Sequence, residues 1–286
     1  MIYSRLATVF LAVGSAFSAP LVKRGSTDVE ILNYALTLEY LEDNFYSGAL
    51  AKFDAAAFEA AGFPSWVRAR FEQIAAHEAA HVAFLAGALG SSATAACQYS
   101  FPYTDPKSFA ALSMVLEGVG VSAYLGAAAS ITNKDYLTAA GSILTTEARH
   151  ASWVSSAVNE GSPWSGALDV PLDFDEVYSL ASAFITSCPS TNPALPVKAF
   201  PALTFSPATA MPGDEITVNY KGATDNMFMI FYTGLSHMSA LISNGKVNIP
   251  KGLEGTVYGV VSTNSTAVTD DTTKAGPAVF VFPVGF

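Results

Sequence analysis

The chain has 286 residues, of which 51% are apolar and only 13% are charged, so it holds enough apolar side chains for a large core or for two domains. Acidic residues outnumber basic residues 24 to 14, which gives a formal net charge of −10. Because phosphate binding needs clustered Lys and Arg, and the sequence has no such cluster, the composition argues against a nucleic-acid partner.

Residues 1–19 have the layout of a secretory signal peptide, with Arg5 before an apolar run and small residues near the expected cleavage point. The apolar run is shorter than the roughly 20 residues that span a bilayer, so a membrane anchor is the weaker interpretation. Residues 20–24 are expected to be a short propeptide that ends at the dibasic pair Lys23-Arg24. We therefore expect a secreted protein, extracellular or in the cell wall, with no membrane span once the signal is removed.

Residues 28–187 are rich in Ala, Leu and Glu, and their apolar residues recur at three- and four-residue spacing, which indicates helices. Prolines separate the segments. The pattern predicts one helical domain with helices at 28–48, 64–89, 106–130, 133–158 and 173–187. In the stretch 108–133 the only charged residue is Glu117. That length would suit a membrane span, but Ala, Ser and Gly dominate the stretch, so we expect a buried helix.

After a Pro-rich linker at 188–200 the composition changes. Residues 201–286 contain short β-branched and aromatic runs, broken by Pro-Gly, Asn-Gly and Lys-Gly turns. This is typical of a small all-β module and predicts an immunoglobulin-like β-sandwich. The expected fold class is mainly α, a four-helix bundle followed by this module.

Two cysteines and one glycosylation sequon fit a secreted chain. Cys97 and Cys188 are the only cysteines, and an even pair in an oxidising compartment favours a disulfide over two separate thiols. Asn264 begins the sequence Asn-Ser-Thr in a polar, loop-like stretch and is the predicted glycosylation site.

Residues 77–81, His-Glu-Ala-Ala-His, match the H-E-x-x-H pattern of zinc metalloproteases. A zinc protease needs a third protein ligand. The extended motif fails, because Phe84 stands in place of its Gly and Gly87 in place of its last His. A downstream carboxylate such as Glu117 would have to serve instead, so the protease is the weaker hypothesis.

A second stretch repeats part of this motif. Glu147 and His150 have the E-x-x-H spacing of Glu78 and His81, but Thr146 occupies the place of the first histidine. The repeated unit is therefore E-x-x-H alone. Spacing i, i+3 puts a Glu and a His on one helix face, where both can reach the same metal ion.

Each E-x-x-H helix is preceded by a helix with a carboxylate in an apolar setting, Glu39 in the first case and Glu117 in the second. Seven residues after each stands a tyrosine, Tyr46 or Tyr124, and seven residues return to nearly the same face of a helix. These tyrosines are candidate radical or hydrogen-bonding partners of a metal site, and packed core aromatics are the equal alternative.

The order Glu, E-x-x-H, Glu, E-x-x-H is the ligand set of a carboxylate-bridged dimetal site in a four-helix bundle. Four carboxylates and two neutral imidazoles bind two divalent ions and nearly cancel their charge. The predicted metal ligands are Glu39, Glu78, His81, Glu117, Glu147 and His150.

The sequence does not decide the roles of two residues that lie next to these ligands. Glu42 competes with Glu39 as a ligand from the first helix. His77 points about 100° away from Glu78, so it is either a partner of the ligands or a surface residue.

On these six residues and the two Glu-x6-Tyr spacings, residues 28–187 resemble the ferritin-like domain of fungal secreted proteins known as stress-response or late sexual development proteins. They are also similar to plant desiccation-related proteins. The resemblance implies a ferritin-like bundle that binds two iron or two manganese ions. It does not extend to the β module.

Two functions remain in view. The first is a secreted oxidoreductase that acts on O2 or H2O2, as an oxidase, ferroxidase, peroxidase or manganese-catalase-like enzyme. The second is a non-catalytic extracellular protein that binds metal for stress protection, with possible cell-wall contact or self-association. Storage in a closed cage fits poorly, since an appended β module would crowd a shell.

Overall fold

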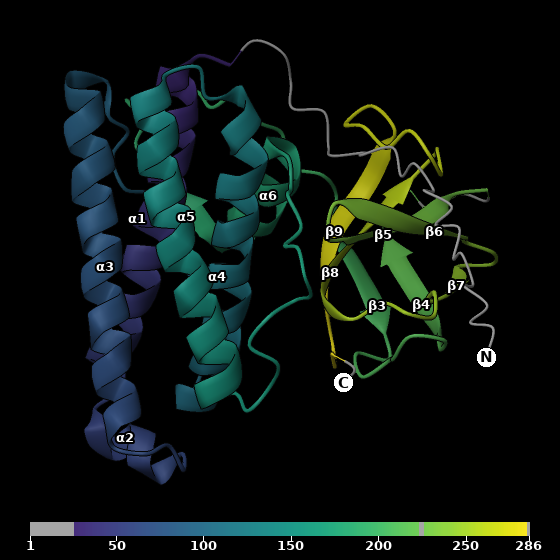
Figure 1. The fold of residues 1–286 in the computed structure, drawn as a ribbon, viewed down its shortest axis with the longest axis horizontal. Coiled ribbons are helices and arrows are strands. Elements are labelled where there is room, and N and C mark those ends of the chain that lie inside the picture. The colour runs from purple at the N-terminus through teal and green to yellow at the C-terminus, as the bar shows by residue number, and fades with distance from the viewer. Residues whose placement is uncertain (1–25, 223–225, 285–286) are drawn as a thin grey trace, which may run out of the picture.

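The computed structural model describes residues 26–222 and 226–284. A bundle of helices occupies one side of the molecule and two β-sheets occupy the other (Figure 1). The expected fold class, a mainly helical chain with a β module behind it, is confirmed. The predicted signal peptide and propeptide lie outside the described residues.

Four long helices form the bundle, and α1 packs mainly on α3 while α4 packs mainly on α5 (Figure 1). Side-chain caps define where α1 and α4 begin: the Thr27 side chain accepts from the Glu30 amide before α1, and Asp105 caps α4 in the same way. Their bounds are α1 Asp28–Lys52, α3 Trp66–Leu89, α4 Pro106–Ala127 and α5 Lys134–Trp153. A 3₁₀ turn, Ala128–Ser130, extends α4, and a π-helical turn, Val154–Val158, extends α5.

Two shorter helices differ from expectation. The helix α2, Ala55–Ala60, was not predicted; Asp54 caps it by accepting from the Ala57 amide. The helix predicted at 173–187 is wrong in its second half. It ends as α6, Phe174–Ala181, and continues through a 3₁₀ turn into strand β2, Ile185–Ser187.

Strand β2 forms because it pairs with a second strand. It pairs with β1, Gln98–Tyr99, and the Cys97–Cys188 disulfide joins the two segments next to these strands. The β-branched residues of β2 and its partner outweigh the tendency of the α6 pattern to continue. The predicted disulfide is confirmed.

The β half is a sandwich of two antiparallel sheets. A three-stranded sheet has the order β3-β4-β7, and a four-stranded sheet has the order β6-β5-β8-β9. Among the described residues these seven strands, three in one sheet and four in the other, give an immunoglobulin-like arrangement in which β5 and β8 are the central strands of the larger sheet. The bounds are β3 Leu203–Ser206, β4 Glu215–Tyr220, β5 Phe228–Thr233, β6 Ser236–Leu241, β7 Lys246–Asn248, β8 Gly255–Ser262 and β9 Thr273–Phe282.

The central strands of the four-stranded sheet, β5 and β8, are buried on both faces. Met229 and Phe231 of β5 point into the sandwich core, while Ile230 and Tyr232 belong to the core that the sheet shares with the helices. Alternate residues of a strand face opposite sides, so this strand has no solvent face. Tyr258 of β8 lies in the shared core and donates to the carbonyl of Gly118 at 3.0 Å. The two halves are thus one packed structure.

The apolar helix α4 is long and apolar enough, with its 3₁₀ extension, to cross a membrane by length and composition alone. In the structure 61% of its most hydrophobic window is buried, between the other helices and the β half. This fits the core helix that the sequence predicts.

Candidate metal centre

The structure brings all six predicted ligands together in the middle of the bundle. Each of the four long helices contributes one glutamate, and all four of these glutamates are 0% exposed. The two histidines come from α3 and α5. The residues are Glu39 from α1, Glu78 and His81 from α3, Glu117 from α4, and Glu147 and His150 from α5.

The six residues form two overlapping groups of four. In each group one donor atom from every residue lies within 4.8 Å of the others. The first group is Glu39, Glu78, His81 and Glu147, and the second is Glu78, Glu117, Glu147 and His150. Glu78 and Glu147 belong to both, so they occupy the positions that carboxylate bridges between two ions would take.

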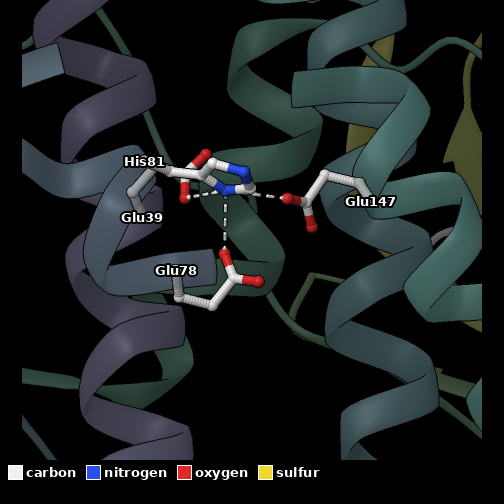
Figure 2. A group of neighbouring side chains, drawn as sticks. All are labelled: Glu39, Glu78, His81 and Glu147. Atoms are coloured by element: carbon white, nitrogen blue, oxygen red, sulfur yellow. Dashed lines mark hydrogen bonds and ion pairs between the residues drawn. The ribbon is translucent and has the colours of Figure 1, made fainter. Parts of the chain in front are cut away.

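The first group is centred on His81 (Figure 2). Its Nδ1 lies 3.2 Å from a carboxylate oxygen of Glu39, 3.2 Å from one of Glu78 and 3.1 Å from one of Glu147. Three carboxylates from three helices thus converge on one ring nitrogen. Donor atoms this close together could surround one bound ion.

The second group repeats this geometry around His150. Its Nδ1 lies 3.2 Å from an oxygen of Glu78 and 3.2 Å from one of Glu117. The Glu147 carboxylate of the same helix is 3.9 Å away. Both histidines therefore point the same ring nitrogen at the shared carboxylates.

The two tyrosines hold the outer carboxylates by bonds that cross between α1 and α4. Tyr124 of α4 donates to Glu39 of α1 at 2.5 Å, and Tyr46 of α1 donates to Glu117 of α4. Tyr46 also bonds the hydroxyl of Ser113 at 2.7 Å. The sequence places each tyrosine on the face of its own helix's glutamate, but the partner is the glutamate of the other helix. These hydroxyls orient the carboxylates from outside the cluster.

Burial and mutual repulsion disturb the protonation of the cluster. Burial, with the charges of nearby glutamates, raises the pKa of Glu39 to about 8, and it holds the pKa values of Glu117 and Glu147 well above their usual range. Glu78 is the exception: burial opposes it, but bonds from His150 and His81 lower its pKa to about 2. So many buried carboxylates cannot all be ionised without added positive charge.

The shared carboxylates also have oxygens that lack hydrogen bonds. Glu78 Oε1 and both oxygens of Glu147 are buried without a properly directed donor, although histidine nitrogens lie at ion-pair distance from some of them. Buried oxygens of this kind are costly unless something satisfies them. Two cations between the groups would satisfy these oxygens and neutralise the carboxylates, so the residues fit a pair of divalent ions.

His77 lies outside both groups but contacts one of their members. Its Nδ1 is 2.9 Å from Nε2 of His150, on the side of the ring that faces away from the carboxylates. A metal-binding histidine commonly bonds a partner in this way, which fixes its tautomer and orientation. The geometry does not suit a zinc protease, in which His77 and His81 would hold the same ion.

An open groove of about 830 Å³ runs along α3 and α5 on the histidine side of the cluster. His77, His81 and His150 line its floor, and Arg70 and Arg149 are among its other lining residues. The imidazole side of the cluster therefore borders this groove, while the four glutamates are fully buried.

Glu42 is the residue that sequence reasoning could not place. It is 5% exposed and belongs to neither group of four, so among the described residues Glu39 is the carboxylate that α1 brings to the cluster. Burial and the charges of the neighbouring glutamates raise the pKa of Glu42 well above its usual range. Gly120 lies against it: a Cβ there would be 3.1 Å from Glu42 Oε1 and 3.5 Å from Glu147 Oε2.

Comparison with known proteins agrees with this architecture. Residues 27–160 match the family model of the ferritin-like domain. Over 177 residues the chain is 28% identical to Protein rds1 of Schizosaccharomyces pombe, a match that covers 62% of this chain and 44% of that protein. The chain therefore spans less than half the length of this curated relative. Both matches confirm the resemblance of the helical half to fungal ferritin-like proteins.

Proposed function

We propose that this ferritin-like protein, a relative of fungal rds1, binds two iron or two manganese ions and performs oxidoreductase chemistry on O2 or H2O2. The observation that carries the proposal is the pair of four-residue groups that share Glu78 and Glu147. The ligand types suit iron and manganese equally. Two such ions, when bound, supply redox chemistry that protein side chains lack.

The residues of the chain have separate tasks in this proposal. The four buried glutamates hold the ions and balance their charge, and the two histidines complete each group. The tyrosine hydroxyls on Glu39 and Glu117 keep those carboxylates directed inward. His77 orients His150 from the groove side. Tyr46 and Tyr124 are also placed to exchange a proton with the carboxylate that each contacts.

Secretion is part of the proposal. The Cys97–Cys188 disulfide supports an oxidising compartment, because cytosolic proteins rarely keep such bonds. The proposed glycosylation site, Asn264, lies in the turn after β8, where its side-chain oxygen accepts from the Thr266 and Ala267 amides. A mass shift on glycosidase treatment of the secreted protein, absent in Asn264→Gln, would test this.

One experiment separates the enzyme from a non-catalytic metal-binding protein. The secreted full chain is analysed for bound metals and then assayed for consumption of O2 and H2O2, beside Glu117→Ala and the exposed control Glu72→Ala. Two Fe or Mn per chain, with turnover that is lost only in Glu117→Ala, would support the enzyme. The same metals without turnover would favour metal binding for protection, and a single zinc with peptidase activity would overturn the proposal.

A further inference from the structure

A cavity of about 390 Å³ lies between the helical bundle and the β half. Its walls come from α1, α4 and α6 on one side and from residues 200–203 and 276–277 on the other. A volume of this size is in the range of small-molecule sites in proteins, about 300–1,000 Å³. Neither half of the chain forms the cavity alone.

The lining is apolar, with three polar side chains: Ser179, Ser182 and Glu42. The Ser179 hydroxyl donates to the Asp175 carbonyl at 2.6 Å and accepts from the Phe200 amide at 2.7 Å. The Ser182 hydroxyl donates to the Ser179 carbonyl at 3.3 Å. Both serines are therefore already engaged with the backbone.

Glu42 differs from the two serines. It is 95% buried, and within residues 26–222 and 226–284 we find no hydrogen bond to its carboxylate. A buried polar group without a partner is costly, so its retention in an apolar lining calls for a ligand. Glu42 is the one polar side chain of the lining that is free to accept a donor from a guest molecule.

One end of the cavity lies near the candidate metal cluster. Gly120 lines the cavity, and a Cβ there would be close to Glu42 Oε1, at 3.1 Å, and in ordinary contact with Glu147 Oε2, at 3.5 Å. Gly120 is thus a lining residue that lies close to both Glu42 and a shared carboxylate of the cluster. A molecule bound beside Glu42 would therefore lie next to a shared carboxylate.

We propose that this cavity is the binding site for an organic substrate of the dimetal centre. The substrate is a small, uncharged molecule that is apolar apart from one hydroxyl or amine hydrogen, which it donates to Glu42. The apolar walls select the body of the molecule, and Glu42 selects its donor and directs that end toward Gly120. That the bound molecule is a substrate rests on the proposed function, whereas its binding in the cavity does not.

The test uses 2-naphthol and naphthalene, which differ by one hydroxyl. The full chain is titrated with each probe by fluorescence, once as purified under nitrogen and once after metal removal. We expect 2-naphthol to bind about tenfold more tightly than naphthalene, since one buried hydrogen bond distinguishes the two complexes. Glu42→Leu should remove this preference by weakening 2-naphthol alone. Glu42→Gln, which keeps an acceptor oxygen, should preserve it.

Two neighbouring positions on α4 give a matched control. Val115 lines this cavity, whereas Met114 lines a different one on the α5 side of the helix. Val115→Trp should weaken both probes at least tenfold, and Met114→Trp should weaken neither, with circular dichroism confirming that each variant is folded. Equal binding of the two probes to the unaltered protein, or an unchanged preference in Glu42→Leu, would overturn the proposal. If the unaltered protein binds 2-naphthol as expected but shows no turnover of O2 or H2O2, the proposed function is overturned and the binding site is not.

Discussion

The two helix pairs of the bundle, α1 with α3 and α4 with α5, contribute matching halves of the candidate metal centre. Glu39 and Tyr46 on α1 correspond to Glu117 and Tyr124 on α4, and the E-x-x-H unit of α3 corresponds to that of α5. The match explains why two groups of donors form around a common pair of carboxylates.

Three of the positions at which the halves differ lie close to the ligands or to their tyrosines. Glu42 on α1 corresponds to Gly120 on α4, His77 on α3 corresponds to Thr146 on α5, and Ser113 on α4 corresponds to Ala35 on α1. At each of these positions one of the two residues contacts the site: Glu42 lies close to Gly120, His77 contacts His150, and Ser113 bonds Tyr46. The repeated residues build the cluster, and the unrepeated ones make its two sides chemically unequal.

The largest expected effect comes from the carboxylates that both groups share. Glu78→Ala should lower the metal content from about two ions per chain to near zero, whereas Glu39→Ala should remove about one, because Glu78 belongs to both groups and Glu39 to one. Metal analysis of the purified proteins checks this, with Glu72→Ala on the outside of α3 as the control. Retention of one full ion in Glu78→Ala would show that the groups are independent.

The second effect is the pH dependence of the metal-free protein. The folded-state pKa of Glu39 is raised to about 8, so its contribution to stability is fully present below about pH 4.5 and is lost as the pH rises toward 8. The pKa of Glu78 is lowered to about 2, so its contribution is lost as the pH falls below about 4.5. The melting temperature should therefore be highest near pH 4.5 to 5 and fall toward pH 9.

Two carboxyl groups outside the cluster also have raised pKa values, mainly because they are buried and also because other carboxylates lie nearby. The pKa of Asp173 is raised to about 9 and that of Glu176 to about 7. The stabilising contribution of these two groups is therefore also lost as the pH rises. Adding metal distinguishes the cluster from them, because the ions bind at the cluster. Bound cations favour ionised carboxylates, and the gain in melting temperature on adding Mn²⁺ should increase from pH 5 to pH 8. A gain that does not change with pH would contradict this account.

The third effect separates the two ion positions. His77→Ala removes the partner of His150 and should weaken one of two metal-binding steps by about 10- to 100-fold, leaving the other step unchanged. Thr146→Ala, at the corresponding position of α5, should change neither step. Competition titration with a chelating dye resolves the steps. Equal weakening of both would mean that His77 acts on the bundle as a whole.

The smallest effect concerns the crossed tyrosines. Tyr124→Phe removes one bond to Glu39 and should lower the free energy of unfolding by about 1 kcal/mol. Tyr46→Phe should cost more, roughly 2 kcal/mol, since it also leaves the Ser113 hydroxyl without this partner. Chemical denaturation of the metal-free proteins measures both. A larger loss for Tyr124→Phe would reverse the assigned asymmetry.

The sequence alone predicts which residues gather in the bundle, because the E-x-x-H spacing and the order of the four segments are local properties of the chain. It could not choose between Glu39 and Glu42, because these glutamates are three residues apart, about one helical turn. They differ in which residues of the neighbouring helices they face. The pairing of each tyrosine with the other helix's glutamate likewise depends on how α1 and α4 are aligned.

The β half shows a similar limit. The runs at 228–233 and 255–262 predict strands, but their nearly continuous apolar character also signals burial on both faces. That signal is ambiguous until the helices are seen to cover the sheet. The wrong end of the helix predicted at 173–187 has the same origin, since β2 becomes a strand only by pairing with β1.

The wall of the cavity formed by Gly276 and Pro277 has a consequence for how the protein is made. On the ribosome the four long helices emerge well before β9 and can assemble first, as domains generally do during synthesis. Until β9 docks, the side of α4 that carries Gly120 stays open to water. Because β9 is synthesised after all four long helices, the wall that Gly276 and Pro277 form is the last part of the cavity to be put in place.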